Sequence, residues 1–268
     1  MAFLPVPEPF DFELSTARFR RFGTDLASRW EDGALYRVVA GRELRIAAAP
    51  GGVDVEPLDA ATEPAVRALL GLVFELEPFY AWAALDAVLA PLARRYRGFR
   101  PPLSADPFEA LVTTITAQQV SLFSAAAIRN RLIERFGRPV GRAWEFPARE
   151  RLAAASEEEL VAAGFSRRKA EYIVGLARSD LDLDGLAALP DDEVKARLVA
   201  LRGLGEWTAD WFLARHLARP RAWPVGDLAL RKVVAALYGE VDVRALGDRF
   251  DPFQNLTAHY LLAQYLAP

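Results

Sequence analysis

The chain of 268 residues contains no cysteine and only two histidines, His216 and His259. The absence of thiols excludes disulfide bonds, thiolate metal sites, iron-sulfur clusters and cysteine nucleophiles. Two imidazoles are too few for a histidine-rich metal centre. Chemistry in this protein must therefore rest on carboxylates, hydroxyls, aromatic rings or arginines, and we expect no metal and no organic cofactor.

Long apolar runs are also missing. No apolar run reaches the roughly 18 residues that a transmembrane helix needs. The N-terminal segment MAFLPVPEPF has no basic residue and carries three prolines, which is unlike a secretory signal. We therefore expect a cytoplasmic protein without a membrane partner.

Lysine is scarce. Of the 33 basic residues only Lys169, Lys195 and Lys232 are lysines, so 30 are arginines, and the net charge is −3. An acidic balance argues against a nucleic-acid partner. The planar guanidinium nevertheless suits phosphate binding and stacking. A genome-wide arginine bias accounts for most of this composition, so charge alone does not decide the question.

The pattern along the chain predicts an α+β fold. Residues 34–58 alternate short apolar segments with turn residues, which indicates an antiparallel meander. A helix that begins at Thr62 has the apolar spacing to cover one face of this sheet. From Phe79 onward helical periodicity replaces the alternation, and we expect an all-helical body. Capping signals open two of its helices, at Asp106-Pro107 and at Ser156 with Glu159.

The segment 191–217 predicts two helices joined by the tight hairpin RGLG. Gly203 and Gly205 are expected to supply positive φ angles and close approach. The first amides of the second helix would be free to bind a phosphate, which would let an acidic protein grip DNA locally. An ordinary glycine-terminated helical hairpin has the same sequence pattern.

Two features beside this hairpin could carry chemistry. Trp207 and Trp211 are four residues apart and share one helix face. Asp227, in the sequence PVGD, precedes a further helical segment and is predicted at or next to its N-cap. Taken alone, the tryptophans are typical of a core and the aspartate of a simple cap.

In combination these residues resemble the helix-hairpin-helix base-excision DNA glycosylases. The motif L-x-G-x-G-x-x-T-A runs from Leu201 to Ala209, and Asp227 follows 22 residues after Gly205. Bifunctional members carry a lysine nucleophile two residues after the second hairpin glycine, where this chain has Trp207. The resemblance therefore implies a monofunctional enzyme without Schiff-base lyase chemistry.

Residues 106–137 and 164–177 are similar to the corresponding segments of bacterial 3-methyladenine DNA glycosylase II, a subfamily that also begins with a small sheet domain. The resemblance implies an N-terminal domain of residues 1–82 and two helical lobes, one formed by 83–106 with 219–268 and one by 107–218. It implies that Asp227 is catalytic and that the base pocket contains Trp207, Trp211 and Phe253. The implied DNA contacts are Gln118, Gln119, Arg202, Gly203, Leu204, Gly205 and Thr208.

The chain departs from this pattern at several positions. Gln119 occupies the place of an intercalating residue that is often leucine. Phe253 and Leu256 replace aromatics expected near the pocket, and the N-terminal pocket position falls on Phe19 or on Arg18. A group of basic residues could meet phosphates beside the lesion, although solvated helix faces explain them equally well: Arg129, Arg131, Arg135, Arg138, Arg142, Arg167, Arg168 and Lys169.

The resemblance implies that alkylated bases of the 3-methyladenine type are flipped out of duplex DNA and hydrolysed from the sugar. A cationic base would stack on Trp207 and Trp211 while Asp227 stabilises the oxocarbenium-like sugar. The alternatives are a mismatch or uracil-type glycosylase and a non-catalytic helix-hairpin-helix DNA-binding protein. We expect a monomer in the bacterial cytosol or nucleoid, and a monovalent cation at the hairpin backbone is left open.

Overall fold

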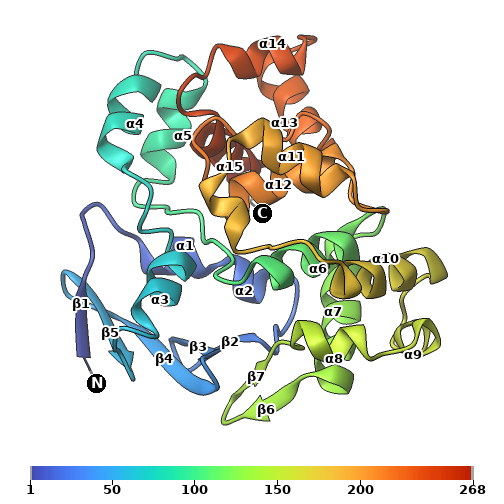
Figure 1. Ribbon diagram of the computed structural model, residues 1–268. Helices are drawn as coiled ribbons and strands as arrows, with labels where there is room; N and C mark the ends of the chain where they lie inside the picture. Colours follow the sequence, from blue (N-terminus) through green and yellow to red (C-terminus); the bar gives the residue numbers. More distant parts are fainter. Residues whose placement is uncertain (1, 267–268) are drawn as a thin grey trace.

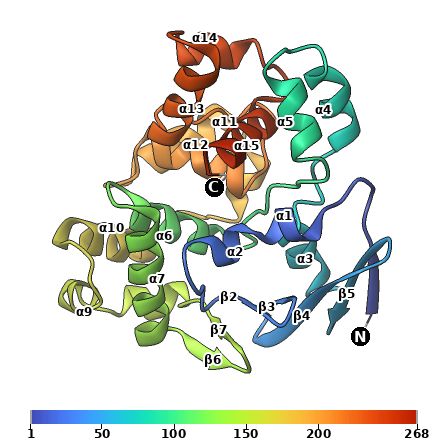
Figure 2. The ribbon, with the colours of Figure 1, turned by 180° about the vertical axis from the view of Figure 1, so that it is seen from behind.

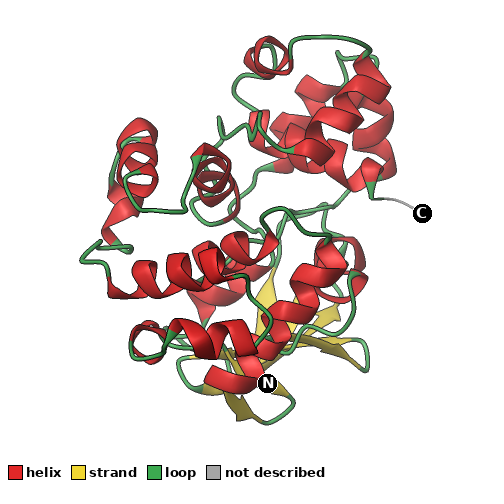
Figure 3. Ribbon diagram, turned by 90° about the vertical axis from the view of Figure 1, so that its right-hand side faces the viewer, coloured by secondary structure: helices red, strands yellow, loops and turns green. Residues whose placement is uncertain are grey.

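The computed structural model describes residues 2–266 and places a five-stranded antiparallel sheet at one side of a largely helical molecule (Figures 1 and 3). The sheet order is β1-β5-β4-β3-β2. Its strands are β1 (Ala2–Pro5), β2 (Ser28–Glu31), β3 (Ala34–Val39), β4 (Arg42–Ala49) and β5 (Gly52–Glu56). The predicted meander of residues 34–58 is confirmed as β3, β4 and β5.

Three short helices cover one face of this sheet (Figure 2). They are α1 (Phe12–Thr16), α2 (Arg18–Arg21) and α3 (Glu63–Leu69). The register pairs Leu35 with Ile46 and Ile46 with Val55, which puts these side chains on one face. They form a separate apolar core with Phe12 and Val66. The N-terminal segment is therefore a small domain with its own buried face.

The remainder of the described chain is mainly helical. The helices are α4 (Leu76–Ala83), α5 (Leu89–Arg95), α6 (Pro107–Ala117), α7 (Leu122–Phe136), α8 (Arg149–Ala153), α9 (Glu157–Ala162), α10 (Arg167–Arg178), η1 (Gly185–Ala188), α11 (Asp191–Val199), α12 (Glu206–Arg215), α13 (Leu228–Tyr238), α14 (Val243–Asp248) and α15 (Gln254–Tyr265). Asp106 caps α6 and the Ser156–Glu159 capping box opens α9, so both predicted helix starts are confirmed. None of the helices within residues 2–266 has both the length and the apolarity to cross a bilayer.

The sequence pattern predicts an all-helical body, but the structure contains strands there as well. A two-stranded hairpin, β6 (Arg138–Val140) and β7 (Ala143–Glu145), interrupts it. The backbone N–H of Trp144 donates to Leu26 O at 2.8 Å, and β7 packs beside β3. Strands of three residues have too little alternation to be recognised, and they are stabilised here by contact with the N-terminal sheet.

The helical segments share one continuous core, and α4 belongs to it. Phe79 of α4 lies 4.8 Å, centroid to centroid, from Tyr260 of α15. The aromatic side of α4 therefore packs on the C-terminal helix and away from the sheet core. Helix α12 packs against both α6 and α11 and so links the two halves of the body.

A group of four charged residues, three of them buried, joins the N-terminal domain to the helical body. Glu109 of α6 accepts hydrogen bonds from Arg37 of β3 at 3.0 Å and from Arg129 of α7 at 2.6 Å. Arg129 also bonds to Asp25 at 2.5 Å. All four residues line a large cavity between the domains, so this ion group fixes one wall of the candidate site.

Candidate active site

Asp227 is the N-cap of α13, as the sequence predicts. Its Oδ1 accepts hydrogen bonds from the backbone N–H groups of Ala229 at 2.9 Å and Leu230 at 3.0 Å. The side chain thus satisfies two amides that a helix start leaves unpaired. A carboxylate at this end of a helix is also stabilised by the helix dipole.

The second carboxylate oxygen is held by the two tryptophans. The indole N–H groups of Trp207 and Trp211 both donate to Asp227 Oδ2, at 2.9 and 3.0 Å. The spacing of four residues on α12 puts both rings on one face, as predicted, and that face meets the start of α13. Four N–H groups therefore fix the orientation of one carboxylate and stabilise its negative charge.

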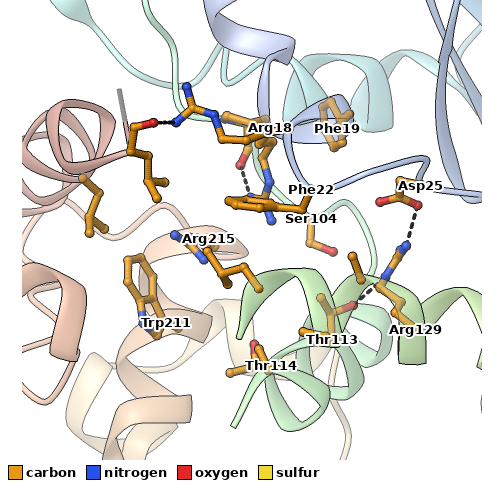
Figure 4. A pocket seen from close by; sticks show the side chains of 18 of the residues that line it. Arg18, Phe19, Phe22, Asp25, Ser104, Thr113, Thr114, Arg129, Trp211 and Arg215 are labelled. Atoms are coloured by element: carbon orange, nitrogen blue, oxygen red, sulfur yellow. Dashed lines mark hydrogen bonds and ion pairs between the residues drawn. The ribbon is translucent and has the colours of Figure 1, made fainter. Parts of the chain in front are cut away.

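This carboxylate opens on a cavity of about 1280 Å³ (Figure 4). The lining includes Asp227, both tryptophans, residues of α2 and the α6–α7 loop, and His259 of α15. The predicted catalytic aspartate and the predicted aromatic face thus share one cavity.

The hairpin between α11 and α12 lies at the edge of this cavity. Gly203 has a φ of +89°, and a Cβ there would lie 2.1 Å from Tyr172 Cγ, so both predicted reasons for a glycine apply. Gly205 differs from the prediction, because its φ of −99° is ordinary extended backbone and a Cβ would meet open space. Gly205 is the N-cap of α12 and has no side chain to cover the first amides, which leaves room for a phosphate.

Gln118 and Gln119 have different environments. Gln118 donates its side-chain N–H to Gly203 O at 3.0 Å and to Thr208 Oγ1 at 3.3 Å, so it braces the hairpin. Gln119 is exposed in the loop with a φ of +54°, a conformation that L-residues rarely adopt. Phe123, in the first turn of α7, is 65% exposed and packs edge-on against Phe22, which lines the cavity.

The other residues singled out in the sequence lie in different environments. Phe253 does not line the cavity; its ring packs 5.3 Å from Trp82 in the helical core. Phe19 and Arg18 both line the cavity, so each of the two alternatives is present there. Arg202 is exposed but pairs with Glu171 at 2.7 Å, and Leu204 is buried beneath the hairpin.

Most of the proposed phosphate-binding arginines have protein partners. Arg129 is buried in the ion group described above, where Asp25 and Glu109 pair with its guanidinium. Arg138 and Arg142 pair with Glu145 and Asp32. Lys169 donates to Thr116 O at 2.9 Å. These contacts favour a structural role for this part of the arginine content.

Arg215 and His259 line the cavity and were missed in the sequence analysis. The Arg215 guanidinium carbon lies 3.6 Å from the Trp211 ring centroid, so it covers a face of the ring on which a cationic base was expected to stack. Burial and the nearby Arg18 lower the pKa of Arg215 to about 9, while Asp227 acts in the opposite direction. Burial and the charge of Arg215 lower the pKa of His259 to about 3, so its imidazole is neutral.

Comparison with known proteins places this site in a family. The model of the HhH-GPD superfamily base excision DNA repair proteins matches residues 112–243, which contain the hairpin, both tryptophans and Asp227. The chain is 27% identical over 250 residues to a DNA-3-methyladenine glycosylase of Bacillus subtilis, covering 85% of this chain and 82% of that protein. It is 32% identical over 176 residues to the DNA-3-methyladenine glycosylase 2 of Escherichia coli, covering 64% of this chain and 62% of that protein.

A solved structure agrees with these relatives. The 3-methyladenine DNA-glycosylase from Archaeoglobus fulgidus superposes with a TM-score of 0.89 at 28% identity, covering 99% of this chain and 98% of that one. The chain thus resembles the HhH-GPD superfamily in sequence over residues 112–243 and in fold over nearly its whole length. The resemblance drawn from the hairpin motif and the expected α+β fold are thereby confirmed.

The indole N–H groups of Trp207 and Trp211 should affect the rate of the chemical step. Trp207→Phe and Trp211→Phe keep an aromatic ring but each delete one hydrogen bond to Asp227 Oδ2. A hydrogen bond to a charged group contributes about 1.5–3 kcal/mol, so we expect each variant to release a damaged base about 10- to 100-fold more slowly in single-turnover assays.

Trp223→Phe is the matched control for these variants. It deletes an indole hydrogen bond of 2.9 Å to Val243 O, and Trp223 does not line the cavity. The control should keep the wild-type rate of base release. Equal rates in all three variants would show that the indoles of Trp207 and Trp211 do not support Asp227.

Proposed function

We propose that this protein is a monofunctional DNA glycosylase that hydrolyses the N-glycosidic bond of alkylated bases of the 3-methyladenine type in duplex DNA. The observation that carries the proposal is the Asp227 carboxylate. It lies at the N-terminus of α13, accepts hydrogen bonds from two indoles and lines a cavity beside the α11–α12 hairpin. The curated relatives, which are named DNA-3-methyladenine glycosylases, support the substrate class.

The reaction requires an everted nucleotide, because a stacked base is out of reach of any side chain. Alkylation of a ring nitrogen makes the base cationic and weakens its bond to C1′. As this bond breaks, its electron pair leaves with the base and positive charge develops on the sugar. The fixed negative charge of Asp227 stabilises that sugar and orients the attacking water. Water adds its oxygen to C1′ and loses a proton, and the products are the free base and an abasic site.

A lyase step needs an amine that can form a Schiff base with the sugar. Trp207 stands at the hairpin position where that amine would be expected, and no lysine lines the cavity within residues 2–266. The proposed enzyme therefore leaves the DNA strand intact. We propose that the enzyme acts as a monomer on the chromosome in the bacterial cytosol.

The test is a duplex treated with a methylating agent and incubated with the wild-type protein. Free 3-methyladenine should appear by chromatography, and strand breaks should appear only after alkali opens the abasic sites. Binding of the duplex without base release would favour the non-catalytic DNA-binding alternative. Release of uracil or of a mismatched base, but not of methylated bases, would favour the other glycosylase class.

A further inference from the structure

Arg215 is a partly buried cation without a carboxylate partner in the described structure. Its Nε is buried and has no hydrogen-bond partner, and no ion pair within residues 2–266 involves it. It lies at the C-terminal end of α12, stacked on Trp211, and projects into the cavity that Asp227 faces (Figure 4). Such a group loses hydration without compensation unless a ligand supplies an acceptor.

His259 contacts the same indole and offers the complementary group. Its ring lies 5.8 Å from the Trp211 ring, and its Nδ1 bonds to Asn255 O at 2.9 Å. Because Asn255 O is an acceptor, Nδ1 carries the proton and Nε2 is an acceptor. That Nε2 is buried and has no partner in the described structure. Two residues that line the cavity thus carry buried polar atoms without partners, a donor on Arg215 and an acceptor on His259.

A purine with a carbonyl at C6 carries the matching pattern, because its O6 accepts and its N1–H donates. A purine with an amino group at C6 presents a donor where the guanidinium also donates. We propose that Arg215, with His259, is a specificity-determining residue of this site that favours damaged 6-oxopurines over damaged 6-aminopurines. This inference rests on the proposed function and ranks the alkylated purines within its substrate class, with 7-methylguanine ahead of 3-methyladenine.

Methylated duplex DNA tests the inference, because it contains 7-methylguanine, a 6-oxopurine, and 3-methyladenine, a 6-aminopurine, in the same molecule. Both lesions are cationic, so repulsion by Arg215 affects them alike and cancels in the ratio of the released bases. In Arg215→Met the ratio of 7-methylguanine to 3-methyladenine released should fall at least about tenfold.

Two further variants make the result specific. Arg215→Lys keeps the charge but loses the planar fork, and its ratio should lie between those of the wild type and Arg215→Met. Arg94→Met removes an exposed arginine that does not line the cavity and should leave the ratio unchanged. If Arg215→Met does not fold, as judged by its thermal transition, Arg215→Gln replaces it and should show the same fall.

The outcomes separate the two proposals. Equal slowing for both bases would show that Arg215 binds a phosphate or only supports Trp211, and would overturn the inference. An unchanged ratio would overturn it as well. In both cases the wild-type protein still releases bases and the proposed function stands. A wild-type protein that releases no base from methylated DNA would instead remove the proposed function and this inference with it.

Discussion

Asp227→Asn is expected to slow base release by about 1000-fold while leaving duplex binding largely intact. The substitution keeps the size of the side chain but removes the negative charge that stabilises the oxocarbenium-like sugar, and fixed charges of this kind are the largest single contribution in many active sites. The rate is measured in single-turnover assays with a methylated duplex. Affinity is measured separately with a duplex that carries an abasic site.

The geometry makes this substitution more severe than a simple loss of charge. Both carboxylate oxygens accept two N–H groups, two from the backbone of α13 and two from the indoles. Asparagine has one acceptor oxygen and one NH2 group, so a donor must face either the indoles or the amides. We therefore expect the variant to be less stable as well as slower.

Asp242→Asn separates the cost of the cap from the chemistry. Asp242 caps α14 in the same way, with hydrogen bonds from Arg244 N at 2.8 Å and Ala245 N at 3.3 Å, and it does not line the cavity. This control should lose stability but keep the wild-type rate of base release. If Asp227→Asn behaved like it, with base release within about tenfold of wild type, Asp227 would be a helix cap and not the catalytic group.

The sequence predicts the positions of this site better than its contacts. The cap residue Asp227 and the shared face of Trp207 and Trp211 follow from local spacing, which depends only on helix geometry. That both indoles donate to one oxygen depends on side-chain rotamers and on the packing of α12 against α13. Arg215 could have been found, because it continues the spacing of four residues after Trp211, but His259 lies on a helix that only the tertiary fold brings close.

The strands also divide into those that the sequence predicts and those that it does not. The central strands β3, β4 and β5 have alternation and clear turns, and these were predicted. The edge strands β1 and β2 were missed because AFLP ends in proline and SRWE is largely polar, and both are held by pairing with their neighbours. Phe253 was predicted in the pocket from the family resemblance alone, whereas its ring packs in the core against the aromatic rings of α4.

Glu109→Gln is expected to lower the free energy of unfolding by about 3–5 kcal/mol, the largest effect on stability among these variants. Glu109 neutralises Arg37 and Arg129, which are both buried, and its loss leaves a buried guanidinium without enough negative charge. Urea unfolding at neutral pH measures the difference. Glu145→Gln, which breaks the exposed pair with Arg138, should cost less than about 1 kcal/mol.

The pKa of Glu109 determines how the difference in unfolding free energy between wild type and Glu109→Gln changes with pH. Burial alone would raise the pKa of Glu109, but the charges of Arg37 and Arg129 outweigh it and lower that pKa below its ordinary value. A carboxylate with a lowered pKa contributes stability at neutral pH, and that contribution is lost as the pH falls through the acid range. The gap between wild type and Glu109→Gln should therefore narrow on acidification. A gap that stays constant with pH would mean that shape, and not charge, joins the sheet domain to the helices around the cavity.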